Sequence, residues 1–377
     1  MNWADYLIPA NYSVGKYGSL GDVVVMYKGE LGFEIPASTK VAIIGIPEDR
    51  FSDGAGEIKS PGIIRKQLYA LSAGSQGTVI DLGNLRTGKT LADTYYGLRD
   101  VLLELYRYDV VTLLLGGTMD VFYGNYLAMA EQGNILSYIA PQLRFPSRHA
   151  ENHPLNALIF HQSESFKPFH ICNIGYQSYY VPQHDLDFFS DRHFEAYRLG
   201  EVREGNLRGS EPVIRDTDLL AISMDVVKYS DAPAASNSSP NGFTGEEICQ
   251  IAFFAGLSHR CRSMGIFDMI PQNDVQDITA KLTAQMAWYF VEGIKKRNPD
   301  NPKDDVQNFK KYLIYFDQLR HNLCFYKNIQ TERWWMEVPS SSDDQSYVII
   351  SCTQEDYVKA AEQEIPDRWW KTYQRFN

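Results

Sequence analysis

Residues 110–119 read Val-Val-Thr-Leu-Leu-Leu-Gly-Gly-Thr-Met, and this stretch decides the fold class. Its first six residues form the longest apolar run in the chain, which is far too short to span a membrane. A continuous apolar run of this length is typical of a strand that is buried on both faces. The sequence therefore predicts a central strand of a covered sheet, followed by a glycine turn.

Similar runs lie on both sides of this stretch and predict further strands. They occupy residues 40–45, 78–82, 219–224 and 263–270. Stretches with helical spacing separate several of them, at residues 63–71, 91–106, 246–257 and 277–294. Strands that alternate with helices imply right-handed crossovers and a mainly parallel sheet. The prediction is therefore an α/β protein with three layers, α/β/α.

The ends of these strands indicate where a functional site would lie. In open parallel sheets, ligands bind beyond the carboxyl ends of the strands. Two predicted strands are followed by residues 116–120 and 225–233, and the loop over residues 231–245 is rich in Ala, Ser, Asn, Pro and Gly. The sequence therefore places the candidate site at these loops.

Composition limits the possible partners and compartments. The chain has 377 residues, of which 44% are apolar and 22% are charged, as in ordinary folded proteins. The 36 Lys and Arg against 47 Asp and Glu give a net charge of −11, which disfavours nucleic acid and anionic lipid as partners. The start lacks the pattern of a secretory signal, and the five cysteines show no metal-type spacing. We expect a soluble, cytoplasmic protein without a membrane span.

The last part of the chain differs in character. Residues 295–305 contain Asn-Pro pairs and mixed charge, and predict a boundary that divides the chain into residues 1–37, 38–297 and 298–377. Strands are expected at residues 311–316 and 323–326. Two Arg-Trp-Trp triplets follow, and they are either a protein-docking surface or a clamp that holds the extension on the main domain. The clamp is favoured because exposed tryptophans promote aggregation. The triplets are Arg333, Trp334 and Trp335, and Arg368, Trp369 and Trp370.

Four motifs between residues 41 and 294, in this order, resemble the arginase, agmatinase and formimidoylglutamase family of ureohydrolases. Their wording is most similar to bacterial formimidoylglutamase-like sequences. The motifs are Gly45-Ile46-Pro47 with Ser60-Pro61-Gly62; Leu113 to Gly117; Ile222 to Asp225 with Ser230 to Pro233 and Gly242-Phe243-Thr244; and Met269 to Asp274 with Thr279-Ala280. The resemblance implies the arginase-type fold, and an enzyme in which two manganese ions activate water to cleave a linear amidine.

The positions that match the family's metal ligands have largely lost their donors. Met119 stands where the family has histidine, and a thioether is a soft ligand that suits Mn(II) poorly. Val227 stands where the second aspartate of the third motif should be. Residues 139–145 match a ligand-rich family motif but contain no carboxylate or imidazole, and Arg144 is their charged residue. Of the expected ligands, only Asp225 is retained.

The remaining polar candidates each have a plainer interpretation. Asp225 itself is favoured as a carboxylate that orders its loop. Asp120 lies next to the lost ligand position and is expected to point elsewhere. Glu247 matches the family glutamate that pairs with the guanidinium of the substrate, but with Thr244 it also forms a helix-capping pattern, which is favoured.

The histidines offer a possible substitute metal site, which the sequence does not favour. His149 and His153 lie four apart, but Pro154 makes a helix poor there. His161 and His170 follow.

The leading hypothesis is a non-catalytic member of this fold that acts through protein contacts or by sensing a small cationic ligand, with no cofactor. The alternative is a formimidoylglutamase-like or agmatinase-like hydrolase with a remodelled manganese site. Relatives of this kind form trimers or hexamers, so a protein partner or self-association is expected.

Overall fold

The computed structural model describes residues 3–376 except for 11–14, 31, 53–55, 75–77, 130–134, 144–169, 206, 208, 299, 304–305, 317–320 and 341–345. None of the helices in these described segments has the length and apolarity needed to cross a bilayer.

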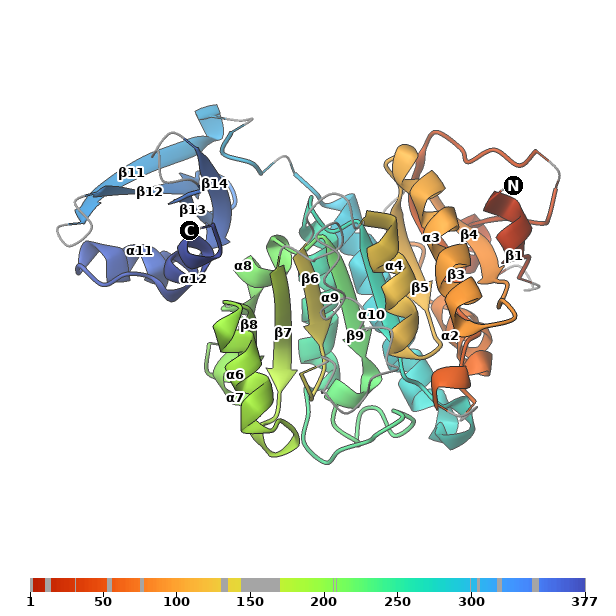
Figure 1. Ribbon diagram of the computed structural model, residues 1–377. Coiled ribbons are helices and arrows are strands. Elements are labelled where there is room, and N and C mark those ends of the chain that lie inside the picture. The colour runs from red at the N-terminus through yellow and green to blue at the C-terminus, as the bar shows by residue number, and fades with distance from the viewer. Residues whose placement is uncertain are drawn as a thin grey trace.

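The main part of the chain is built around one large sheet (Figure 1). Among the described residues this sheet has ten strands in the order β1-β4-β3-β5-β10-β9-β6-β7-β8, with β2 paired to β4. All pairings are parallel except that of β1 with β4. The strands are β1 (Leu7–Ile8), β2 (Val25–Met26), β3 (Thr39–Gly45), β4 (Thr78–Leu85), β5 (Val111–Leu115), β6 (Ile135–Ile139), β7 (His170–Tyr176), β8 (Glu195–Arg198), β9 (Leu219–Ser223) and β10 (Ser263–Phe267).

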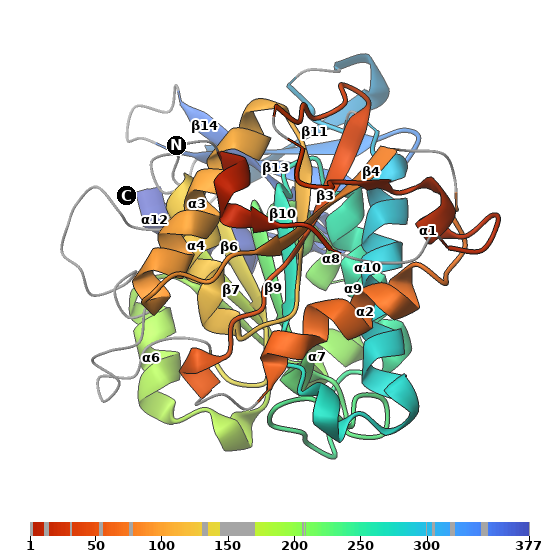
Figure 2. The same cartoon turned by 90° about the vertical axis from the view of Figure 1, so that its right-hand side faces the viewer.

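Helices cover both faces of the sheet, and Figure 2 shows α3, α4 and α6 on one side and α2, α7, α9 and α10 on the other. The predicted three-layer α/β/α architecture is confirmed. The helices are α1 (Leu20–Val23), α2 (Ser60–Leu68), α3 (Leu91–Arg107), α4 (Phe122–Met129), α6 (Gln183–Asp191), α7 (Leu199–Glu204), α8 (Ser210–Arg215), α9 (Gly245–Leu257) and α10 (Ile278–Lys295).

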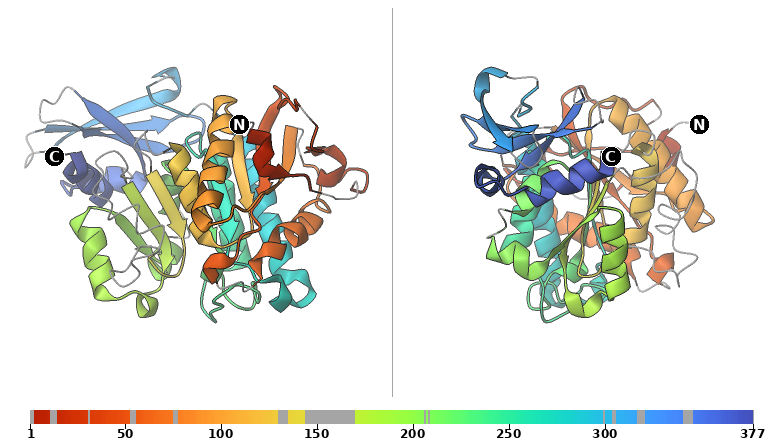
Figure 3. Two further views of the ribbon diagram at one scale, coloured as in Figure 1. Left: turned by 45° about the vertical axis from the view of Figure 1, so that its right-hand side comes forward. Right: turned by 60° about the vertical axis from the view of Figure 1, so that its left-hand side comes forward.

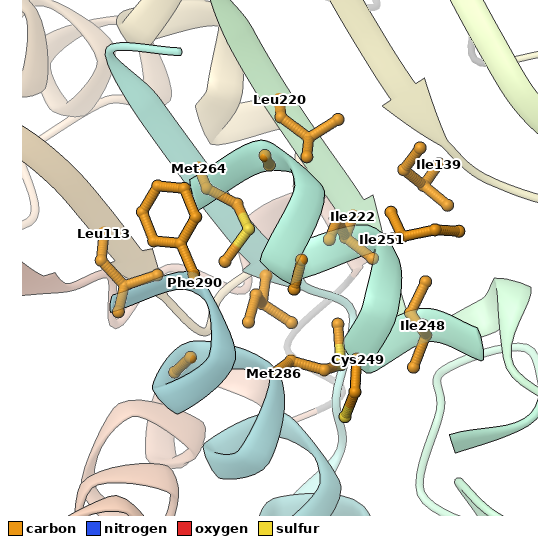
Figure 4. Close-up of a cluster of buried hydrophobic side chains, with 14 of the residues drawn as sticks. Leu113, Ile139, Leu220, Ile222, Ile248, Cys249, Ile251, Met264, Met286 and Phe290 are labelled. Atoms are coloured by element: carbon orange, nitrogen blue, oxygen red, sulfur yellow. The ribbon is translucent and has the colours of Figure 1, made fainter. Parts of the chain in front are cut away.

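The central strands are mostly apolar because helices cover them on both sides. Every residue of β5, β9 and β10 is buried. Figure 4 shows the cluster between the sheet and helices α9 and α10, where Leu113 and Leu220 lie near Met264 and Phe290. Two of the few polar side chains in these strands pair with each other: the Thr112 hydroxyl donates to Ser263 Oγ at 2.7 Å.

Residues 1–37 and 298–377, expected as extensions, have different roles. The first segment contributes β1 and β2 to the edge of the main sheet. The second forms a separate antiparallel sheet in the order β11-β12-β13-β14 with two helices. Its elements are β11 (Phe309–Phe316), β12 (His321–Asn328), β13 (Trp334–Pro339), β14 (Tyr347–Cys352), α11 (Gln354–Ala361) and α12 (Asp367–Phe376).

The C-terminal sheet is fastened to the main domain by charged side chains. Both panels of Figure 3 place it (blue) beside the green part of the main domain. Arg368 on α12 donates to Asp216 at 2.9 Å and to the Ser351 carbonyl at 2.7 Å, and its Nε lies 3.5 Å from Glu195. Arg333 forms ion pairs with Glu211 at 3.3 Å and Asp300 at 3.2 Å. Both arginines of the repeated triplet thus bind within the chain.

The four tryptophans of the triplets have different surroundings. Trp335 lies under the guanidinium of Arg215, which is 4.2 Å from its ring centroid. Trp334 stacks on Tyr357, and Trp369 donates from Nε1 to the Glu337 carbonyl at 2.8 Å, so these two pack inside the C-terminal sheet and its helices. Trp370 is 40% exposed. Within the triplets, the contacts with the main domain are therefore made by the arginines and Trp335, whereas two of the other tryptophans form a local core.

Candidate functional site

Three loops meet where the candidate site was expected, because β5, β10 and β9 are neighbours in the sheet and end at the same edge. The loop after β5 begins with Gly116 and Gly117, whose φ angles are +80° and +77°. A Cβ on Gly116 would lie 2.2 Å from Ser60 Oγ, and one on Gly117 would lie 2.7 Å from the Ile46 carbonyl oxygen. Only glycine fits both this backbone and this space.

Asp268, directly after β10, joins the three loops, although no motif identified it. Its carboxylate accepts hydrogen bonds from the Met119 backbone at 2.9 Å and from the Ser223 hydroxyl at 2.6 Å. Its carbonyl accepts from the Ser236 backbone N–H at 2.9 Å. The signal available in the sequence was an aspartate at the carboxyl end of a buried strand.

Met119 and Val227 are packed into the apolar cores. Met119 is 2% exposed and belongs to the cluster under α3 and α4, and Val227 is fully buried in the cluster under α9 and α10. The two side chains thus fill space in separate cores on the two faces of the sheet. Both residues, which the sequence analysis matched to metal ligands of the family, are thus part of the hydrophobic packing.

Asp225 orders the loop that follows it. Its carboxylate accepts hydrogen bonds from the Ser236 hydroxyl at 3.0 Å and from the Asn237 backbone N–H at 2.8 Å. The side chain is 2% exposed, so these bonds compensate its burial. This arrangement corresponds to the loop-ordering role that the sequence favoured.

These donors do not fit a pair of manganese ions. Hard cations of this kind need several oxygen or imidazole ligands, whereas Met119, Val227 and Asp225 present a thioether, a hydrocarbon and one carboxylate that is already hydrogen-bonded. Within the described residues no group of three His, Cys, Asp or Glu side chains is placed to hold a metal ion. Arg144 and the histidines at 149, 153 and 161 lie outside the described residues.

His170 is described, and it lies away from this site, on β7. Its Nε2 is 2.7 Å from Glu195 Oε2, and the Tyr197 hydroxyl donates to the other carboxylate oxygen at 2.8 Å. Burial lowers the pKa of His170 to about 4, so the ring is neutral at pH 7. His170 is therefore part of the buried polar network beneath Arg368.

Glu247 and Thr244 cap helix α9. The Glu247 N–H donates to Thr244 Oγ1 at 3.2 Å, and the Thr244 N–H donates to Glu247 Oε2 at 2.7 Å. Glu247 also accepts two hydrogen bonds from the guanidinium of Arg203, each at 3.0 Å. Partial burial favours the neutral acid, but the bonds from Arg203 and Thr244 prevail and lower the pKa of Glu247. A cation from solution would have to displace Arg203.

Asp120 is a buried acid whose charge is poorly compensated. Tyr95 donates a hydrogen bond to Oδ2, whereas Oδ1 has no hydrogen-bond partner. Burial, together with the nearby carboxylates of Asp268 and Glu48, raises the pKa of Asp120 to about 6. Asp120 thus stays protonated in mildly acidic solution.

This shift predicts a pH-dependent effect of Asp120→Asn. The folded state keeps the Asp120 proton up to about pH 6, whereas an unfolded chain releases it near pH 4, so this group lowers the free energy of unfolding as the pH rises between these values. We expect Asp120→Asn to be about 2 kcal/mol more stable than the wild type at pH 8, and equal within about 0.5 kcal/mol at pH 4, in urea unfolding. The matched control is Asp109→Asn, at a side chain that is 89% exposed. An equal gain at both pH values would contradict the assignment.

Comparison with known proteins shows the family and the fold of this chain. The sequence profile of the arginase family matches residues 39–292. A formimidoylglutamase from Staphylococcus carnosus is 24% identical over 249 residues, which cover 63% of this chain and 79% of that protein. The crystal structure of Trypanosoma cruzi formiminoglutamase with Mn²⁺ aligns with a TM-score of 0.64 at 20% identity, over 74% of this chain and 99% of that one. The formimidoylglutamase from Bacillus subtilis aligns with a TM-score of 0.66 at 19% identity, over 77% and 96%. On the profile match and the shared fold, this chain belongs to the arginase family.

Proposed function

We propose that this chain is a non-catalytic arginase-family protein that acts by binding a protein partner or a small ligand. The observation that carries the proposal is the packing of Met119 and Val227 into two apolar cores at positions where the family has metal ligands. A bound metal generates hydroxide at neutral pH by lowering the pKa of water, and the apolar side chains of Met119 and Val227 supply no ligand for it. We therefore propose that no manganese cofactor is needed.

The expected small cationic ligand is less well supported than a protein partner. Arg203 already pairs with Glu247, which is the residue that would recognise a cation by resemblance. The exposed Trp370 on α12 is a candidate contact for a partner or a second copy of this chain. The buried, unpaired state of all five cysteines supports a reducing compartment, and we propose the cytoplasm.

The second candidate function is hydrolysis of a linear amidine by a remodelled site. It is favoured by the formimidoylglutamases among the similar proteins and by the retained Asp225. The two proposals differ in one measurable property, which is turnover in the presence of Mn(II).

An activity assay separates these candidates. Purified protein is incubated with Mn(II) and with formiminoglutamate, agmatine, arginine or guanidinobutyrate, and the release of formamide, urea or ammonia is measured. We expect release no faster than in buffer with Mn(II) alone, because one hydrogen-bonded carboxylate does not hold two hard cations. Manganese-dependent turnover of any of the four compounds, absent from the Asp225→Asn variant, would show that the protein is a hydrolase and contradict the first proposal.

A further inference from the structure

Strand β11 forms an open edge of the C-terminal sheet. It pairs with β12 on one side, and no strand in the described part of the chain pairs with its other side. Figure 1 shows β11 at the outer border of this sheet. The strand is eight residues long, and an open edge of this length is a template for pairing with another chain.

The backbone groups of the odd-numbered residues of β11 point to this open edge. The Ile329 N–H donates to the Asn308 carbonyl at 2.9 Å, and these two residues continue the register of β12 with β11. Because opposite residues in an antiparallel pair are alternately bonded and non-bonded, the even-numbered residues of β11 bond to β12. The Tyr315 carbonyl accordingly accepts at 3.0 Å from the side chain of Gln363, which lies outside the sheet. The odd-numbered residues therefore present their N–H and C=O groups outward.

The side chains at this edge are mainly apolar. Leu313 is 63% exposed and Tyr315 is 56% exposed, whereas Tyr312 and Ile314 between them pack on the cluster under α11 and α12. The strand contains no proline, and its only charged residues are two lysines near its start. Proteins usually protect such edges with a central charge, a proline or a bulge. The second half of β11 has none of these and is a predicted site of association.

A second copy of β11 fits this edge in an antiparallel register. A two-fold axis at Leu313 places Leu313 opposite its own counterpart and Lys311 opposite Tyr315 of the second copy. Each of these pairs joins outward-pointing backbone groups of both copies. The Tyr315 carbonyl has a second lone pair, so its bond with Gln363 leaves room for another.

Side-chain chemistry favours this register over its neighbours. Lys311 would contact the ring of Tyr315 in the second copy, as it already lies 5.2 Å from the centroid of Tyr326 within the chain. The two Lys311 ammonium groups would be roughly 14 Å apart along the strands, beyond the screening length of about 8 Å. A two-fold axis at Lys311 would instead place two lysines opposite each other, which is unfavourable. An axis at Tyr315 would extend past the end of β11.

We propose that the protein forms a homodimer in which two β11 edges pair antiparallel about Leu313, so that two four-stranded sheets become one continuous sheet. A two-fold interface of this kind is closed and uses the same surface of both chains. One pair of strands makes a small interface, so we expect dissociation in the micromolar range. The inference is independent of the proposed loss of manganese chemistry, because none of these residues belongs to the loops around Asp225.

Sedimentation velocity of the full chain tests the dimer between about 1 and 200 µM. We expect the mass to rise with concentration from 43.0 kDa towards twice that value. Leu313→Pro removes an outward N–H and no bond to β12, so this variant should fold and remain monomeric throughout. The control Leu313→Val keeps the N–H and should dimerise like the wild type. A wild type that stays monomeric would leave the edge to a different protein and overturn the proposal, as would undiminished dimerisation of Leu313→Pro.

Cysteine cross-linking tests the register and decides the matter if Leu313→Pro does not fold. Opposite residues in a bonded pair have Cα atoms about 5.5 Å apart, which a disulfide can span. Leu313→Cys should therefore give a covalent dimer under mild oxidation. Tyr315→Cys is the matched control on the same edge, because its two copies would lie too far apart. The five natural cysteines are buried, so background cross-linking should be low. Cross-linking of both variants alike, of neither, or of Tyr315→Cys alone would overturn the proposal.

Discussion

Replacing Val227 with aspartate is expected to cost about 3–5 kcal/mol of unfolding free energy, and Mn(II) is not expected to restore the loss. Val227 is fully buried among apolar side chains, and its backbone bridges to Phe243. A carboxylate there would be desolvated without a cation, since the neighbouring Asp225 is already occupied by Ser236 and Asn237. The measurement is urea unfolding at pH 7.5 with and without Mn(II).

The matched control for this substitution is Val227→Asn, because asparagine has the same shape as aspartate but carries no charge. It should lose less stability than the aspartate variant, because an amide costs less to bury than an ion. A gain in stability on addition of Mn(II) that occurs in Val227→Asp and not in Val227→Asn would mean that the site still forms a metal cage.

Replacing Arg368 with methionine is expected to destabilise the protein by about 3–5 kcal/mol, because it leaves two buried carboxylates without their cation. Glu195 is 1% exposed and Asp216 is 5% exposed. Burial is the largest cause that lowers the pKa of His170, and it persists in this variant, so it opposes protonation of the ring in place of the lost charge. Unfolding by urea, followed by tryptophan fluorescence, measures the loss.

Lys371→Met on the same helix is the control for Arg368→Met, since it removes the same charge from a half-buried side chain. Its stability should match the wild type within about 0.5 kcal/mol, as is usual away from buried networks. An equally stable Arg368→Met variant would show that the C-terminal sheet is held by apolar contacts alone.

The elements that could be predicted from the sequence are those with an unbroken apolar run or a clear cap. The ends of strands β3, β5 and β9 lie within one residue of the predicted ends. A short, continuous apolar run is typical of a strand buried on both faces, so the pattern predicts these strands directly. Strand β7 was not predicted, because Asn173 and His170 interrupt its apolar pattern and are satisfied only by distant partners, the Ala140 carbonyl and Glu195. Such pairings cannot be derived from local spacing.

In the candidate site and the C-terminal sheet, too, contacts between distant residues could not be predicted from local sequence patterns. Two identical Arg-Trp-Trp triplets fold differently: in β13 Trp334 and Trp335 face opposite sides, whereas Trp369 and Trp370 lie on helix α12. Asp268 and Arg203 were not predicted because each acts through a distant partner in the sequence. Asp268 binds Met119, which lies 149 positions away, and Arg203 binds Glu247, which lies 44 positions away. The sequence predicts that Met119 and Val227 replace ligand residues, but it does not show that their side chains pack in two separate cores.

The central claim is that the positions that match the family's manganese ligands now form apolar core and a hydrogen-bonded loop. The most direct test is the manganese content of the full-length protein after incubation with Mn(II) and desalting, measured by elemental analysis beside protein concentration. We predict a content well below one ion per chain, equal to that of the Asp225→Asn variant. Two ions retained per chain, and lost in that variant, would contradict it.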